Sequence, residues 1–206
     1  MATNMLDGSD RPCHFKGRAA MTCGAIMDKI VRLDEYRARA MEKKAFGLWE
    51  KRFGIAFSAT SKFSDLDDAT LCTLAEPGDE SSEAFYELIM GVLDLGPPAA
   101  FHYLPNADQM NVVEAHLFLA DLSRFEMMRR IGWLAALPCS DLSLVELVLN
   151  QPSLQNESRR NPPELNVDHP AYQDYQAMVT GDKQVFIRQL LTEALTVFKE
   201  RSDIDA

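Results

Sequence analysis

Apolar residues recur at helical spacing along most of the chain, and this pattern predicts an all-α protein. In the segment EAFYELIMGVLDL, Phe85, Ile89 and Leu93 share one face of the expected helix, and Gly96 follows its end. Glu87 lies on the opposite face, which predicts that its carboxylate is solvated. The alternation of apolar and polar residues between turn signals that is typical of a strand does not occur in the sequence.

The longest apolar pattern predicts a central helix from about residue 107 to 137. Asn106 and Gln109 follow Pro105 with the spacing of a capping box, and Pro138 ends the pattern. We expect the other helices to pack around this apolar segment. The predicted architecture is a compact bundle of about five or six helices.

The body of the chain divides into a helical core, a polar segment and a C-terminal pair of helices. Residues 64–150 are predicted to form the helical core, which opens with a short helix that Ser64 can cap. Residues 151–168 are polar and rich in Pro and Asn, which predicts a long loop. Residues 169–206 predict a short helix and a final amphipathic helix, both docked on the core.

The N-terminal part of the chain has a different pattern. Residues 1–26 lack periodicity and predict a disordered leader, so we consider Met27 an alternative start. Residues 27–53 predict a charged helix that is broken near Gly47. Its apolar stripe is narrow, which favours an arm that packs on the bundle along one seam or projects from it, and that binds a partner. The candidate partner-binding residues are Leu33, Leu48, Trp49, Phe53, Arg39 and Lys43.

The distribution of charge narrows the possible partners. The net charge of -10 makes nucleic acid an unlikely partner, because contacts with phosphates need an excess of Lys and Arg. Residues 1–53 contain 11 Lys and Arg against 7 Asp and Glu, whereas residues 54–206 contain 10 against 24. The basic end therefore has an acidic body to pack against, or an acidic partner to bind. We expect a protein partner, or self-association, through the helix of residues 28–53.

Two carboxylates interrupt the apolar pattern of the central helix. At about 100° per residue, Glu114 and Asp121 fall on the same face as Phe118 and Phe125. A buried carboxylate is costly without a partner, so Asp121 should meet a cation, and Arg124 at i+3 is the local candidate. Two roles remain open for these residues: a structural ion pair, or the polar floor of a small-molecule pocket.

The opposite face of the central helix is predicted to be solvated. His116, Ser123 and Arg130 gather on that side of the helical wheel.

The two acids of the apolar face have further options. Arg129, or an arginine from another helix, is an alternative partner for Asp121. Glu114 is close to the start of the helix, where its side chain can also reach solvent.

The motifs of several common catalytic classes are absent from the sequence. It contains no G-x-G-x-x-G, Walker-type loop, G-x-S-x-G or H-E-x-x-H. Glu114 and His116 are two residues apart, which turns them about 200° from each other and disfavours a shared metal ion. Cys13, His14 and Cys23 lack a fourth ligand at zinc-finger spacing. We therefore expect no catalytic residue, metal or cofactor.

The expected function is that of a small all-helical interaction or regulatory module that acts through protein-protein contacts. The alternative is an enzyme or a small-ligand-binding protein with a pocket along the helix of residues 107–137 that uses Asp121 and Glu114. The cysteines are scattered, which predicts a cytoplasmic protein. No apolar run approaches the ~18 residues of a membrane span, so we expect no membrane contact.

Overall fold

The structure is a computed structural model that describes residues 23–137 and 139–202, without the side chains of residues 23–32 and 34. The chain divides into two units, residues 1–36 and residues 37–206. Helices make up most of the described chain, and two short strands form a small sheet. The predicted all-α class is confirmed.

Helix α1 (Cys23–Phe46) is followed closely by the short helix α2 (Trp49–Phe53). The two helices are separated at Gly47 and Leu48, which confirms the predicted break. Residues 1–22 of the predicted leader lie outside the described residues. The last four residues of that segment already belong to α1, so the helix begins before the predicted boundary.

The end of α1 and the start of α2 contribute Ala45, Phe46 and Trp49 to the hydrophobic core of residues 37–206. Trp49 is 0% exposed, and its indole nitrogen donates a hydrogen bond to the carbonyl of Ala84 at 2.7 Å. The Trp49 ring forms edge contacts with Phe46, Phe53 and Phe57. The assignment of Trp49 to a partner-binding surface is therefore wrong, because its ring is buried inside the fold. Phe53 is half-buried against this ring and stays a candidate.

Helix α4 (Asp79–Val92) crosses the end of α1 at close range. A Cβ atom on Gly91 would lie 2.6 Å from the Cα of Ala45, so glycine is required for this approach. The same packing buries Glu87, and Arg52 of α2 lies 3.4 Å from its carboxylate. The predicted solvated position of Glu87 is therefore wrong, since α1 and α2 cover that face of α4.

Two 3-10 helices flank the first part of the core, η1 (Phe63–Asp65) before α3 (Asp68–Ala75) and η2 (Pro98–Tyr103) after α4. The cap of α3 is Asp67, whose carboxylate accepts a hydrogen bond from the backbone nitrogen of Thr70 at 2.7 Å. Ser64, the predicted cap, lies within η1. A 3-10 turn therefore displaces the start of α3 by one turn from its predicted position.

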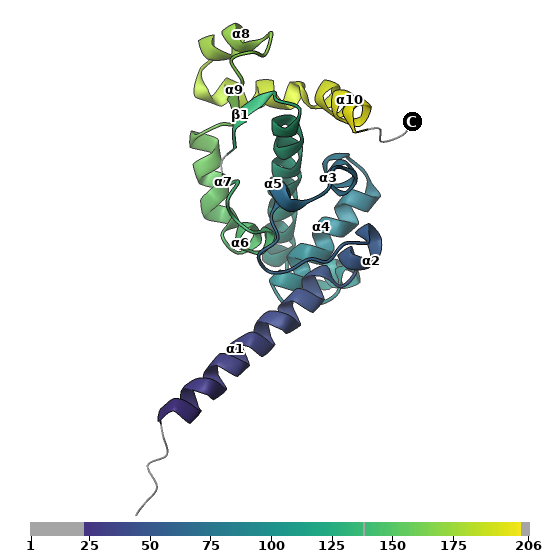
Figure 1. Cartoon of the computed structure of the whole chain (residues 1–206), viewed down its shortest axis with the longest axis vertical. Coiled ribbons are helices and arrows are strands. Elements are labelled where there is room, and N and C mark those ends of the chain that lie inside the picture. The colour runs from purple at the N-terminus through teal and green to yellow at the C-terminus, as the bar shows by residue number, and fades with distance from the viewer. Residues whose placement is uncertain (1–22, 138, 203–206) are drawn as a thin grey trace, which may run out of the picture. The chain divides into compact units, whose positions relative to one another are not determined.

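Helix α5 (Asn106–Arg130) is the central element of this unit and packs against α3, α4 and α10 (Leu191–Arg201), as Figure 1 shows. It ends before Gly132, which has a φ of 81° and so adopts a conformation that favours glycine. Strand β1 (Leu134–Ala136) follows and pairs antiparallel with β2 (Glu164–Leu165). The predicted central helix therefore extends too far, because its last residues form a strand.

The remaining helices are α6 (Leu144–Leu149), α7 (Gln151–Arg160), α8 (Tyr172–Ala177) and α9 (Thr180–Gln189). The prediction of a loop over residues 151–168 is wrong for residues 151–160, which form α7. Pro152 lies in the first turn of α7, where the missing N–H costs no helical hydrogen bond. The predicted final helix is divided at Leu190 into α9 and α10. Helix α7 packs against α5, α6 and α9.

Candidate functional site

A cavity of about 270 Å³ lies beside α5, where residues of α7 and α9 complete its wall. The α5 side is mostly apolar and includes Leu117, Phe118 and Phe125. The polar residues that line the cavity are Asp121, Gln155, Ser158, Arg159, Gln184 and Arg188. The cavity therefore combines an apolar wall with a polar wall that comes from three helices.

Asp121 is held by two arginines at this cavity. A guanidinium nitrogen of Arg188 donates to Asp121 Oδ2 at 2.6 Å. The guanidinium of Arg124 lies 3.7 Å from Oδ1, and its Nε donates to the carbonyl of Ala75 at 3.0 Å. Asp121 thus has both kinds of partner considered from the sequence, a local arginine at i+3 and a closer one from another helix.

The charged residues of the cavity lining favour an anion. Arg159 and Arg188 are opposed by a single carboxylate, that of Asp121, although the chain as a whole is strongly acidic. Gln184 of α9 donates to the carbonyl of Ser158 in α7 at 2.6 Å, which joins the two helices that carry the arginines. The two guanidinium groups are therefore presented by helices that are hydrogen-bonded to each other.

Glu114 does not line this cavity. Its side chain is exposed, in agreement with the option that it reaches solvent. The structure therefore places Asp121 and Arg124 together and leaves Glu114 apart from them, so the predicted pocket with both acids is corrected to one with Asp121 alone.

The face of α5 that was predicted to be solvated is in fact covered. Ser123 is 0% exposed, and its hydroxyl donates to the carbonyls of Ala120 and Leu74. His116 is half-buried beside the ring of Tyr86, and burial lowers the pKa of its imidazole, with nearby Arg124 adding to the effect. The prediction failed because α3 and α4 pack on this side, where small and polar residues allow close approach.

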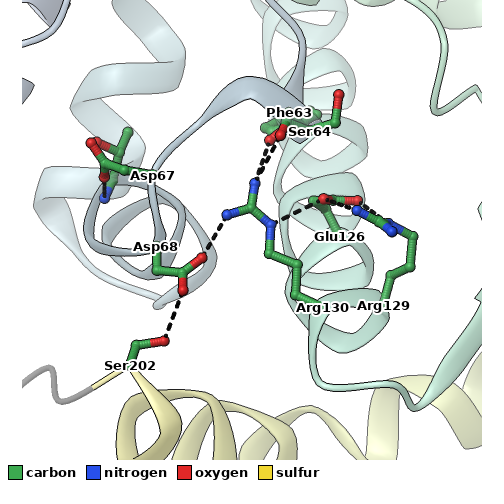
Figure 2. Close-up of polar contacts among 9 residues, drawn as sticks. Phe63, Ser64, Asp67, Asp68, Glu126, Arg129, Arg130 and Ser202 are labelled. Atoms are coloured by element: carbon green, nitrogen blue, oxygen red, sulfur yellow. Dashed lines mark hydrogen bonds and ion pairs between the residues drawn. The ribbon is translucent and has the colours of Figure 1, made fainter.

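A buried ion cluster near the end of α5 was missed in the sequence. Glu126 is almost completely buried, and both of its oxygens accept hydrogen bonds from Arg129 at 2.7 Å. Arg130 Nε donates to the same carboxylate at 3.1 Å, and another nitrogen of Arg130 donates to Asp68 at 2.6 Å (Figure 2). The i+3 and i+4 spacing of two arginines after Glu126 was the signal available in the sequence.

Arg130 also binds the backbone of η1. One of its nitrogens donates to the carbonyls of Phe63 and Ser64 at 3.1 and 3.3 Å, as Figure 2 shows. Asp68 in turn accepts a hydrogen bond from Ser202, at the end of α10. The cluster therefore joins α5, η1, α3 and the C-terminal end of α10, and we interpret it as structural.

The other candidate partner-binding residues lie at the surface. In residues 1–36, Leu33 is 50% exposed and Tyr36 is 70% exposed. In residues 37–206, the side chains of Arg39, Lys43 and Leu48 are exposed. The predicted residues among them stay candidates, in contrast to Trp49, and Tyr36 is an exposed aromatic residue that the sequence analysis did not name.

The basic residues that follow them meet acidic residues of the same unit. Lys44 forms an ion pair with Asp94 at 2.5 Å, and Arg52 forms one with Glu83 at 3.3 Å. Part of the positive charge near the N-terminus is therefore paired with acidic residues of α4 and of the turn that follows it.

Comparisons with protein-family models, with curated proteins and with solved structures found no match. Among the described residues, no group of three or more His, Cys, Asp or Glu side chains is placed to hold a metal ion. Cys13 and His14 lie outside the described residues, as does the side chain of Cys23. No helix in the described part is long and apolar enough to cross a membrane.

Replacement of Asp121 by Ala is expected to lower the free energy of unfolding by only about 1 kcal/mol or less. The Arg188 side chain is 53% exposed, so loss of the carboxylate leaves this cation in water instead of stranding it in the core. Chemical denaturation of Asp121→Ala and Asp121→Asn measures the effect. A loss of about 3–5 kcal/mol would instead mean that Asp121 neutralises a buried charge.

Proposed function

We propose that the protein binds a small organic anion, with a carboxylate or phosphate group and an apolar body, in the cavity between α5, α7 and α9. The observation that carries the proposal is that Arg159 and Arg188 line one cavity with a single opposing carboxylate. Arginine is well suited to such ligands, because its planar guanidinium forms two parallel hydrogen bonds with a carboxylate or phosphate.

The rest of the lining supports a ligand with an apolar part. Phe118 and Phe125 offer aromatic contacts on the α5 side, opposite the arginines. The volume of about 270 Å³ lies just below the range for ligand pockets, which is roughly 300–1,000 Å³. The ligand is therefore expected to be a small molecule with one anionic group.

Binding is favoured over catalysis at this position. The one carboxylate of the lining, Asp121, is already engaged by Arg124 and Arg188, so its oxygens are occupied by ion pairs within the fold. An anion in the cavity would share Arg188 with Asp121 and would take Arg159 as its second contact.

Replacement of Arg159 by Gln is expected to weaken anion binding about ten-fold or more, since it removes one charge-assisted contact. Arg160→Gln is the matched control, because Arg160 is the next residue on α7 and does not line the cavity. Isothermal titration with phenyl phosphate, benzoate and neutral benzyl alcohol measures the dissociation constants and distinguishes the two anionic groups. Equal weakening in both variants, or equal binding of benzyl alcohol, would contradict the proposal.

A second candidate function is protein-protein contact through α1. It is favoured by Leu33 and Tyr36, two large side chains that are exposed one turn apart on this helix. Aromatic and aliphatic residues in such positions are common at the centre of protein interfaces. We take a second copy of the chain as the partner to test, because self-association is measured on the protein alone.

Joint replacement of Leu33 and Tyr36 by Asp is expected to abolish such self-association and to leave the helical content unchanged. Light scattering coupled to size-exclusion chromatography gives the mass, and circular dichroism checks the fold. Glu35→Ala, which alters an exposed neighbour on the same helix, serves as the control. A wild-type protein that stays monomeric over a wide concentration range would rule out self-association through this surface.

A further inference from the structure

A second cavity, of about 340 Å³, lies beside α4 in residues 37–206. Its walls are mainly apolar and come from the end of α1, from α4 and from the turn that leads to η2. Leu48, Met90, Pro97 and Pro98 are among the lining residues, together with Glu87. The cavity is thus mainly apolar, and its charged lining residues are Glu87, Asp94 and Lys44.

The carboxylate of Glu87 is incompletely satisfied. Its side chain is 10% exposed, and its Oε2 is buried without a hydrogen-bond partner in the described part of the chain. Its Oε1 lies 3.4 Å from a nitrogen of Arg52. The same nitrogen is 3.3 Å from Oε2 of Glu83, so one guanidinium group is shared by two carboxylates, and both contacts are long.

The surroundings of Glu87 leave an excess of negative charge. Lys44 and Asp94 line the same cavity and neutralise each other in their own ion pair. Arg52 is shared between Glu83 and Glu87, so one negative charge remains. Burial raises the pKa of Glu87, Arg52 partly offsets this increase and Glu83 adds to it, as expected for a carboxylate that lacks a sufficient counter-charge.

We propose that this cavity binds a small organic ammonium ion, whose N–H groups pair with Glu87 and whose apolar body lies against Leu48, Met90 and Pro97. A buried polar atom without a partner destabilises the fold, and an ammonium group would supply both the missing donor and the missing charge. Oε2 is buried in the structure, so pairing with a ligand requires a rotation of the carboxylate about its terminal torsion, which is soft.

A metal ion fits this cavity less well than an ammonium ion. Calcium binds about 6–8 oxygen ligands, whereas most of this wall is apolar and Asp94 is already paired with Lys44. An organic cation needs few polar contacts and gains from the apolar wall. The site differs in charge and position from the anion cavity at α5, so it does not depend on the function proposed above.

Titration with n-butylammonium chloride, followed by amide chemical shifts of the whole protein, tests this site. Saturable binding is expected, with shifts near Leu48 and Met90, whereas neutral 1-pentanol should bind about ten-fold or more weakly because it lacks the charge. Glu87→Gln should weaken the binding of butylammonium to the level of pentanol. Glu80→Gln removes an exposed carboxylate of the same helix and should leave the dissociation constant unchanged.

A variant that fills the cavity provides an independent test. Leu48 is 48% exposed and lines the cavity, so Leu48→Trp should block binding of butylammonium without removing any charge. Circular dichroism confirms that each variant is folded. The proposal is overturned if wild-type protein shows no saturable shifts at millimolar butylammonium, if pentanol binds equally well, or if folded Glu87→Gln binds as wild type does.

Discussion

Replacement of Arg130 by Ala is expected to lower the free energy of unfolding by about 3–5 kcal/mol. The change removes the contacts with Glu126 and Asp68 and two hydrogen bonds to carbonyls of η1. These contacts come from a side chain that is mostly buried, so water replaces them poorly. Urea denaturation followed by circular dichroism measures the loss.

Arg129→Ala is the matched control for this prediction. Arg129 is the preceding residue, its side chain is 42% exposed, and its described contacts are limited to Glu126. Its removal leaves Glu126 paired with Arg130, so a loss of about 1 kcal/mol is expected. Equal losses in both variants would show that Arg130 does not join the helices as the contacts indicate.

Replacement of Trp49 by Ala is also expected to cost about 3–5 kcal/mol, because it empties a large volume in the core. The indole ring is completely buried, and its nitrogen is hydrogen-bonded to Ala84. The surrounding rings of Phe46, Phe57 and Phe85 would lose their common contact. The free energy of unfolding, obtained from chemical denaturation, is again the measured quantity.

Leu48→Ala separates a core role for this segment from a surface role. Leu48 precedes Trp49 and is about half exposed, so its replacement should cost roughly 1 kcal/mol or less. If Trp49→Ala were as stable as Leu48→Ala, the segment would be peripheral, as the sequence alone suggested.

Helical periodicity predicted most of the helices, but it predicted poorly which faces are buried. A helical wheel assumes one apolar side and one wet side, and this holds for helices that pack on a single neighbour. Helix α5 packs against several helices, so Ser123 and Glu126 are buried as well. Glu87 on α4 is buried for the same reason, since α2 covers the side that its angle predicted to be wet.

Composition misled the prediction for residues 151–160. Asn, Gln and Pro are frequent in loops, but Pro152 occupies a position of the first helical turn where proline is accepted. The contacts of α7 with α5, α6 and α9 then stabilise a sequence of low helical propensity.

The candidate site could be predicted only in part. The wheel placed Asp121 beside an apolar face and next to Arg124, and both features are present. Arg159 and Arg188 could not be assigned to the same cavity, because α7 was not predicted and Arg188 lies 67 residues from Asp121. Contacts at such separation follow from the packing of whole helices, which local patterns do not specify.

Chemical-shift mapping with phenyl phosphate tests the proposed anion cavity most directly. The account predicts that the amide shifts of wild-type protein saturate and are largest in three segments, around Asp121 in α5, Arg159 in α7 and Arg188 in α9. Arg159→Gln should remove most of these shifts, and Arg160→Gln should leave them. Saturable shifts centred on another part of the protein, or none at millimolar ligand, would contradict the proposal that this cavity binds an anion.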